Sequence, residues 1–198
     1  MKRVFIIHGW GGYPEKGWLQ WLKKELEQKG FEVFVPAMPN TDEPKIEEWV
    51  NSLDNLVGKP DENTYFVGHS IGCQTILRYL EKLNGKKIGG AVFVAGWFHL
   101  SEFTFTEEPA DEEEARIIAK PWLETPINFE KIKQTTNNFV AIFSDNDPYV
   151  MPENQKSWKE RVGAEIIVEH NKGHFRGEED NIYELSIVLD SLLKMAEK

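Results

Sequence analysis

The chain has 198 residues, of which 40% are hydrophobic and 28% are charged, and its formal net charge is −10. This length and apolar content predict one globular domain over residues 1–198 and exclude a disordered chain. The acidic balance argues against nucleic-acid binding, which needs a basic surface, and against docking on anionic membranes.

Apolar runs alternate with segments of helical periodicity along the chain. The first run, residues 4–7, ends in a glycine-rich loop at residues 8–12. The predicted strands are residues 4–7, 31–35, 64–67, 90–95, 139–143 and 164–169. The predicted helices are residues 18–29, 45–56, 71–83 and 181–195. Such alternation indicates an α/β fold in which right-handed crossovers build a parallel sheet.

One connection is much longer than the others. Residues 97–138 lie between the fourth and fifth predicted strands and include a strongly acidic stretch at residues 107–114. Because long connections in compact domains often carry function, we expect a lid-like insert or a wall of the active site. The alternative is a solvated acidic helix start that covers the edge of the sheet.

The segment Gly68-His69-Ser70-Ile71-Gly72 follows a predicted strand and leads directly into a predicted helix. It has the pattern Gly-x-Ser-x-Gly, which in this context predicts a sharp turn that exposes a nucleophilic serine. Glycines on both sides of such a turn let the strand and the helix approach closely. The pattern alone is common, but its position between strand and helix makes Ser70 the candidate nucleophile.

A serine nucleophile needs a base, and the base needs an orienting carboxylate. Candidates for both follow the fifth and sixth predicted strands, whose carboxyl ends meet the same edge of the sheet as Ser70. Asp147 is favoured over Asp145 because it precedes a proline and a turn, although both aspartates could serve only as turn formers. His174 is favoured over His170 because His174 lies in a loop. His170 ends a strand and is expected to be half-buried.

Acyl transfer also needs donors for the negative oxygen of the tetrahedral intermediate. The Ile71 amide follows the nucleophile, and the glycine-rich loop supplies the second donor, with Trp10 favoured over Gly9 and Gly11. This loop lacks the patterns of a nucleotide-phosphate cradle. The aromatic residues proposed to line an acyl pocket are Trp10, Trp97, Phe98 and Trp122.

The remaining reactive side chains predict no metal and no other cofactor, because no ligand motif is present. The single cysteine, Cys73, allows no internal disulfide and fits a reducing compartment. The apolar run at residues 4–7 is too short for a signal peptide or a membrane span. We therefore expect a cytoplasmic protein. His8, His69 and His99 are expected to support the site or to lie at the surface, with His69 supporting loop packing.

Several segments beyond the serine motif carry a resemblance to a known family. They are residues 17–27, Met38-Pro39, Lys120-Pro121-Trp122, residues 130–133, Asp147-Pro148-Tyr149-Val150 and Gly173-His174-Phe175. With them, nearly the whole chain resembles the retinoblastoma-binding-protein-9 and YdeN-like family of small serine hydrolases, in the α/β-hydrolase superfamily. The resemblance implies a minimal α/β-hydrolase with a six-stranded parallel sheet in the order 2-1-3-4-5-6, helices on both faces, and a triad of Ser70, Asp147 and His174.

The resemblance does not extend to the family's protein partner. Binding to the retinoblastoma protein is associated with a Leu-x-Cys-x-Glu sequence, and residues 56–62 lack that pattern. We therefore expect a small-molecule acyl substrate, and the sequence leaves the oligomeric state open. The expected activity is hydrolysis of small esters, thioesters or amides through an acyl-enzyme on Ser70. The alternatives are a non-catalytic binding protein of the same fold and an acyltransferase.

Overall fold

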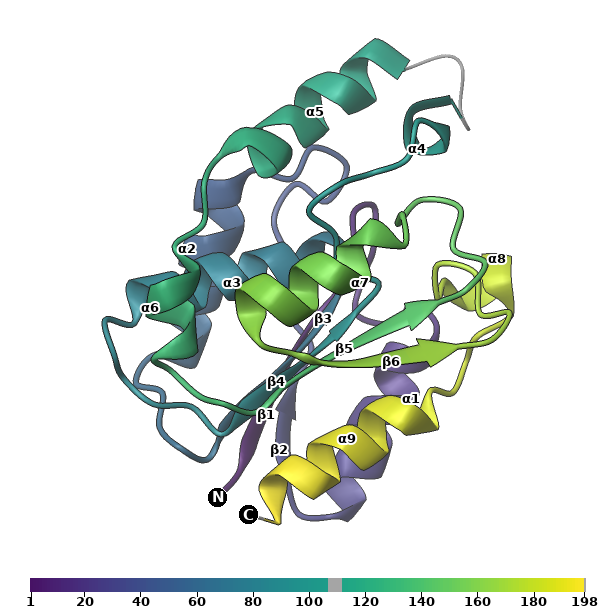
Figure 1. Cartoon of the computed structure of the whole chain (residues 1–198). Coiled ribbons are helices and arrows are strands. Elements are labelled where there is room, and N and C mark those ends of the chain that lie inside the picture. Colours follow the sequence, from purple (N-terminus) through teal and green to yellow (C-terminus); the bar gives the residue numbers. More distant parts are fainter. Residues whose placement is uncertain (107–111, 198) are drawn as a thin grey trace.

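The centre of the molecule is a sheet of six parallel strands (Figure 1). The computed structural model describes residues 1–106 and 112–197. The strands are β1 (Arg3–Ile7), β2 (Glu32–Phe34), β3 (Thr64–His69), β4 (Gly90–Val94), β5 (Phe139–Ser144) and β6 (Glu165–Glu169). Their order across the sheet is β2-β1-β3-β4-β5-β6, which confirms the predicted topology.

The central strands are continuous apolar runs because both of their faces are covered. The side chains of residues 4–7 in β1 have no exposed surface, and every residue of β5 is buried. Strands buried on both faces show no alternation of polar and apolar residues. β6 differs because it lies at the edge: it pairs with β5, and its Val168 is 48% exposed.

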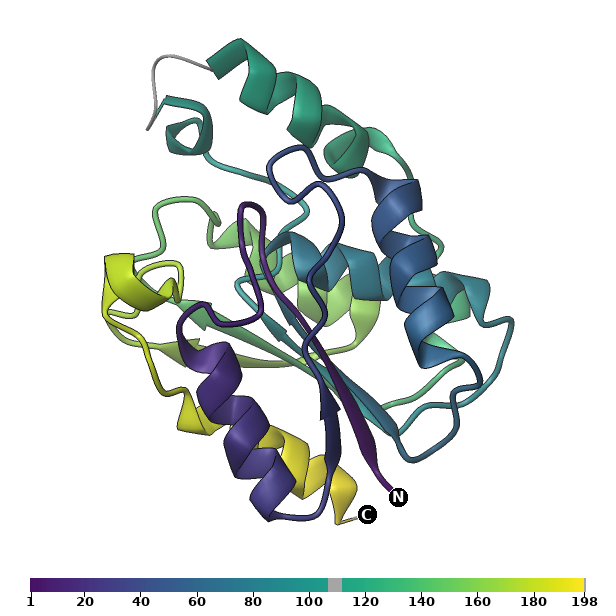
Figure 2. The same cartoon turned by 180° about the vertical axis from the view of Figure 1, so that it is seen from behind.

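Helices cover both faces of the sheet (Figures 1 and 2). Those of the two layers are α1 (Trp18–Gln28), α2 (Ile46–Val57), α3 (Ile71–Lys82), α6 (Phe129–Lys133), α7 (Glu153–Ser157), the π-helical turn η1 (Trp158–Val162) and α9 (Ser186–Ala196). α1 packs against α9 on one face, whereas α2, α3, α6 and η1 form the layer on the other. In α1 the buried residues Trp18, Leu19, Leu22 and Leu26 share one face at helical spacing.

Two parts of the last third differ from the predicted elements. The helix predicted over residues 181–195 begins only at Ser186, because Asn181 has a left-handed backbone (φ 57°) that ends the short helix α8 (Gly177–Asp180). The prediction also names no helix where α7 and η1 lie. Their buried residues Asn154, Trp158 and Val162 recur every four positions, but Asn154 is polar and hides the apolar periodicity.

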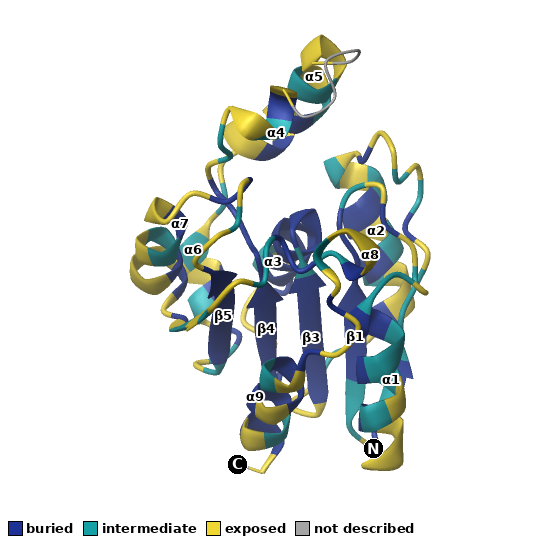
Figure 3. Ribbon diagram, turned by 90° about the vertical axis from the view of Figure 1, so that its right-hand side faces the viewer, coloured by how far each residue is buried: buried dark blue, intermediate teal, exposed yellow. Residues whose placement is uncertain are grey.

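The long connection between β4 and β5 holds α4 (Phe103–Thr106), α5 (Glu112–Glu124) and α6. Figure 3 shows α4 and α5 beyond the carboxyl ends of the strands, whereas α6 packs beside α3. Residues 107–111 of the acidic stretch lie outside the described residues. The far end of α5 is fixed to the body, since the Trp122 indole donates to the Pro44 carbonyl at 2.8 Å and Arg78 donates to the Trp122 carbonyl at 3.1 Å.

Within the described ranges, no helix combines the length and apolar character needed to cross a membrane. The same residues contain no group of three or more histidine, cysteine or carboxylate side chains arranged to hold a metal ion.

Candidate active site

Ser70 occupies the turn between β3 and α3, and its backbone conformation is unusual. Its φ of 53° and ψ of −121° fall in a region that residues with a Cβ rarely adopt. Such a conformation costs about 1–3 kcal/mol and persists only where the surroundings enforce it. Here the Ser70 amide donates to the Val94 carbonyl at 2.9 Å, so the turn is tied to the neighbouring strand β4.

Both glycines of the motif are required by close packing. A Cβ on Gly68 would lie 2.7 Å from the Cys73 amide nitrogen, and one on Gly72 would lie 2.4 Å from the Ile7 carbonyl oxygen. Both distances are shorter than van der Waals contact, so a side chain at either position would push α3 away from the sheet. This is the steric role that the sequence pattern predicts for them.

Asp147 and His174 form a buried hydrogen-bonded pair. His174 Nδ1 lies 2.8 Å from Asp147 Oδ2, and the two side chains are 9% and 2% exposed. The other carboxylate oxygen, Oδ1, accepts the amides of Tyr149 at 2.9 Å and Val150 at 3.1 Å. Asp147 is therefore both a turn former and the partner of a histidine. With Nδ1–H donating to the carboxylate, the His174 Nε2 is left to exchange a proton.

Asp145 and His170, the alternatives in the sequence, pair with each other instead. Asp145 Oδ2 lies 2.5 Å from His170 Nδ1, and the side chains are 42% and 79% exposed. The expectation that His170 is half-buried is wrong, because its ring extends into solvent beyond the edge strand. The hydrogen bond from the Asn171 amide lowers the pKa of Asp145 most, and the hydrogen bond with His170 lowers it further.

The loop that carries His174 is fastened to the loop that carries Asp147. The Lys172 amide donates to Ser144 Oγ at 2.9 Å, and the Gly173 amide donates to Asn146 Oδ1 at 2.9 Å. On the other side, the His174 amide donates to Asp180 Oδ2 at 3.0 Å. The histidine is thus held by backbone bonds on both sides, which fixes where its ring lies.

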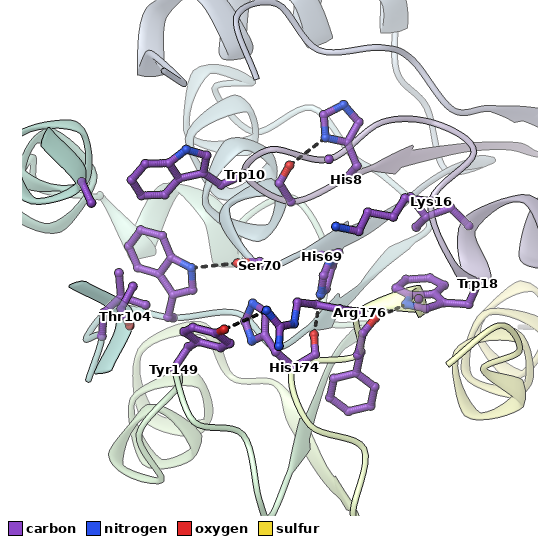
Figure 4. Close-up of a pocket in the computed structure, with 18 of the residues that line it drawn as sticks. His8, Trp10, Lys16, Trp18, His69, Ser70, Thr104, Tyr149, His174 and Arg176 are labelled. Carbon is purple, nitrogen blue, oxygen red and sulfur yellow. Dashed lines mark hydrogen bonds between the residues drawn. The ribbon is translucent and has the colours of Figure 1, made fainter. Parts of the chain in front are cut away.

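Ser70 and His174 line the same cavity, which has a volume of about 370 Å³ (Figure 4). The Trp97 indole N–H donates to Ser70 Oγ at 3.2 Å within it. Of the predicted pocket aromatics, Trp10 and Trp97 belong to the lining.

Phe98 and Trp122, also predicted for the pocket, lie instead in the core. The Phe98 ring packs against Trp158 and Phe129, and the Trp122 ring packs against Trp49. Neither is among the described residues that line the cavity. Both predictions rested on aromatic character, which suits a core as well as a binding wall.

The glycine-rich loop lies against the nucleophile. A Cβ on Gly9 would lie only 3.3 Å from the Ser70 Cβ, which is a tight contact, so the loop passes close to Ser70. The Gly11 amide donates to the Thr41 carbonyl at 2.9 Å, which leaves it a poor candidate for an oxyanion donor. The Ile71 amide begins α3 and has no carbonyl one turn earlier in the helix to bind.

His69, which the sequence places in the serine motif and expects to support loop packing, lies at the cavity. Its ring lines the cavity and donates from Nε2 to the His174 carbonyl at 2.8 Å, so it links the serine turn to the histidine loop. Burial, reinforced by the charge of His174, lowers the pKa of His69 to about 3. Burial also lowers the pKa of His8, and its Nε2 accepts the Met38 amide at 3.1 Å.

The lining residues that the sequence does not predict for the site include Lys16, Tyr149 and Arg176. Tyr149 packs edge-on against the His174 ring with centroids 5.0 Å apart, and its hydroxyl accepts from Arg176 Nη1 at 2.7 Å. The sequence offers a signal for two of them: Tyr149 lies two residues beyond Asp147, and Arg176 lies two residues beyond His174.

Comparison with known proteins places the chain among hydrolases. A family model described as serine hydrolase matches residues 4–184. The putative hydrolase YdeN of Bacillus subtilis (strain 168) is 31% identical over 192 residues, covering 96% of this chain and 94% of the relative. Serine hydrolase RBBP9 of Rattus norvegicus is 27% identical over 197 residues, covering 98% and 97%.

Solved structures agree in fold. The ydeN gene product from B. subtilis superposes with a TM-score of 0.87 at 29% identity, covering all of both chains. Est1E from Butyrivibrio proteoclasticus, solved with ferulic acid bound, has a TM-score of 0.71 at 14% identity and covers 100% of this chain and 90% of the other. At that identity the second likeness concerns the fold alone.

Proposed function

This chain belongs to the serine hydrolase family, and from that premise we propose that it hydrolyses small carboxylic esters, thioesters or amides through an acyl-enzyme on Ser70. The observation that carries the proposal is that His174, which lines the same cavity as Ser70, lies 2.8 Å from the buried carboxylate of Asp147. A carboxylate, an imidazole and a strained serine around one cavity are the parts that nucleophilic acyl transfer requires.

In the proposed reaction Ser70 Oγ attacks the substrate carbonyl while His174 Nε2 takes the hydroxyl proton. The tetrahedral intermediate then collapses as the bond to the leaving group breaks and His174 returns the proton to that group. Water repeats the sequence: it attacks the acyl-enzyme, gives a proton to His174, and the Ser70 ester bond breaks with return of that proton. Asp147 keeps the imidazole oriented and stabilises its charged form.

The negative oxygen of the intermediate needs donors that are already in place. The Ile71 amide, at the start of α3, and the Trp10 amide, in the loop against Ser70, fit this role in the proposal. The Trp10 indole is engaged elsewhere, since it donates to the Asp42 carbonyl at 2.8 Å, so the backbone amide is the donor assigned here. The Trp97 indole holds the Ser70 hydroxyl in one position before attack.

The proposal is tested with a fluorophosphonate probe, which labels activated serines covalently. The native protein should gain one adduct, which peptide mapping places on Ser70, and Ser70→Ala should gain none. Ser52→Ala, on α2 away from the cavity, serves as the matched control and should label like the native protein. Absence of labelling in the native protein, or equal labelling of Ser70→Ala, would rule out the proposed nucleophile.

A further inference from the structure

His8 directly follows β1 and is buried, with 1% of its surface exposed. Its Nε2 lies 3.1 Å from the Met38 amide nitrogen. Its Nδ1 lies 2.8 Å from the Gly9 carbonyl oxygen (Figure 4). A backbone amide can only donate, so Nε2 is the acceptor of the Met38 amide and carries no proton. The ring is therefore the neutral tautomer with its proton on Nδ1, and this proton is donated to the Gly9 carbonyl.

Packing holds the His8 ring in the orientation that these bonds need. Trp49 of α2 packs edge-on against the ring, with centroids 5.4 Å apart. The Trp49 indole in turn donates to the Pro39 carbonyl at 2.7 Å, which ties α2 to the loop that contains Met38. Burial lowers the pKa of His8, in agreement with a neutral ring.

The Gly9 carbonyl has a second donor, the Gly12 amide at 3.1 Å. The turn closes tightly there, because a Cβ on Gly12 would lie 2.8 Å from the Gly9 oxygen. With donors from His8 and Gly12, the direction of the Gly9 carbonyl is fixed. In a planar trans peptide the carbonyl and the following N–H point in opposite directions, so the Trp10 N–H is aimed away from His8.

The peptide on the other side of Trp10 is fixed as well. The Gly11 amide donates to the Thr41 carbonyl at 2.9 Å, and the Trp10 indole donates to the Asp42 carbonyl at 2.8 Å. Both acceptors follow β2, in the same loop as the residue that binds His8 Nε2. The backbone on both sides of Trp10 is thus held by hydrogen bonds, so the direction of its N–H is set before a substrate arrives.

The Trp10 amide itself has no acceptor among the described residues. Trp10 lines the cavity with Ser70, and Gly9 passes close to Ser70. An oxyanion is stabilised best by donors that need no reorientation during the reaction. We propose that neutral His8 is the positioning residue of the oxyanion donor: through the Gly9 carbonyl it fixes the peptide that presents the Trp10 amide. This inference rests on the proposed acyl-enzyme reaction.

Two substitutions separate the roles of the two ring nitrogens. In His8→Asn the side-chain nitrogen replaces Nδ1 and donates to the Gly9 carbonyl, but nothing accepts the Met38 amide. In His8→Gln the side-chain oxygen replaces Nε2 and accepts the Met38 amide, but the Gly9 carbonyl loses its side-chain donor. With 4-nitrophenyl butyrate, His8→Gln should lower kcat about 10- to 100-fold and change KM by less than about threefold, because an oxyanion donor acts in the transition states. His8→Asn should restore most of kcat.

Urea unfolding distinguishes positioning from general damage to the fold. His8→Asn leaves the buried Met38 amide without an acceptor and should unfold at a lower urea concentration than His8→Gln. The order of stability is therefore the reverse of the order of kcat. His99→Gln, at an exposed histidine outside the described lining, is the matched control and should change neither quantity. Equal kcat in the two His8 variants, or a kcat that follows their stability, would overturn the proposal.

Nitrogen-15 NMR of the histidine rings separates this inference from the proposed reaction. In Ser70→Ala, the His8 ring should have a protonated Nδ1 and an unprotonated Nε2. If this tautomer is found while the native protein fails to label with fluorophosphonate, the acyl-enzyme is refuted and His8 still fixes the Trp10 peptide. If Ser70 labels but His8 carries its proton on Nε2, the role of His8 alone is refuted.

Discussion

At the scale of single residues, two aspartate–histidine pairs among the described residues differ chiefly in burial. Asp147 and His174 are enclosed at the cavity, and Asp145 and His170 are exposed at the edge of the sheet. Coulombic and hydrogen-bonding interactions are stronger where water is excluded. The same aspartate–histidine interaction is therefore expected to be stronger in the buried pair than in the exposed pair. The exposed pair is therefore a natural internal control for the buried one.

Asp147→Asn should lower kcat by about 10³-fold or more, because an amide cannot stabilise the charged imidazole or hold its Nδ1–H tautomer. The substitution keeps Oδ1 as the acceptor for the Tyr149 and Val150 amides, so the turn should survive. Asp145→Asn should leave kcat within about threefold, since an exposed pair contributes little. Steady-state hydrolysis of a 4-nitrophenyl ester measures both, and comparable losses in the two variants would contradict the assignment of Asp147.

The sequence indicates Ser70, Asp147 and His174 as site residues because each follows an apolar strand, and strand ends can be located from composition. It does not indicate Lys16 or Arg176, whose entry into the cavity depends on which way their side chains point. Phe98 and Trp122 show the opposite case: the sequence predicts them for the cavity lining, but their side chains are buried in the core. Side-chain direction is decided by packing partners far along the chain, so local pattern alone does not determine it.

At the scale of elements, α4 and α5 contribute residues to the lining of the cavity. Thr104 and Phe105 of α4 and Ala115 of α5 belong to its lining, and Phe105 is only 7% exposed. The insert thus contributes to the lining of the cavity, and its role as a wall of the active site stays a prediction. That the insert opens as a lid stays a prediction. The anchor of such a lid would be the end of α5 at Trp122, which hydrogen bonds fix to the body of the protein.

Phe105→Ala should shift the preference among 4-nitrophenyl esters toward longer acyl chains, because removing the ring enlarges a cavity of about 370 Å³. In the native protein kcat/KM should fall beyond short chains. Ile117→Ala, at a residue of α5 that is 63% exposed, is the matched control and should leave the chain-length profile unchanged. A flat profile in the native protein would remove the support for a closed wall above Ser70.

Elements were easiest to predict where one local signal decides them. The central strands are unbroken apolar runs, and the parallel sheet follows from their alternation with helices. The sequence does not locate the start of α9, because Asn181 takes a left-handed conformation that its sequence neighbours do not dictate. Nor does it indicate α7 and η1, because the polar Asn154 is buried through tertiary hydrogen bonds with backbone groups of residues 98 and 99.

At the scale of the whole molecule, buried histidines couple folding to pH. The pKa of His69 is about 3 in the folded protein and about 6.5 when unfolded. Below pH 6.5 His69 takes up a proton in the unfolded chain but not in the folded one. The contribution of neutral His69 to the free energy of unfolding is therefore complete above pH 6.5 and is lost as the pH falls. At pH 5 the loss from His69 amounts to about 2 kcal/mol.

Urea unfolding at pH 7.5 and pH 5.0 checks this. His69→Gln keeps a donor for the His174 carbonyl but cannot be charged, so its unfolding free energy should drop by about 2 kcal/mol less than that of the native protein over this range. An identical drop in the two proteins would show that His69 accepts its proton in the folded state.

The position of β6 at the edge of the sheet affects the order in which activity and the folded core are lost on heating. The loop that follows β6 carries His174, while Ser70 follows β3 in the middle of the sheet. Edge strands open in local fluctuations well below the free energy of global unfolding. Hydrolysis should therefore disappear reversibly several degrees before the core melts, with amide hydrogens of β6 exchanging faster than those of β3. Coincident loss of activity and of near-ultraviolet circular dichroism would show instead that the edge melts with the core.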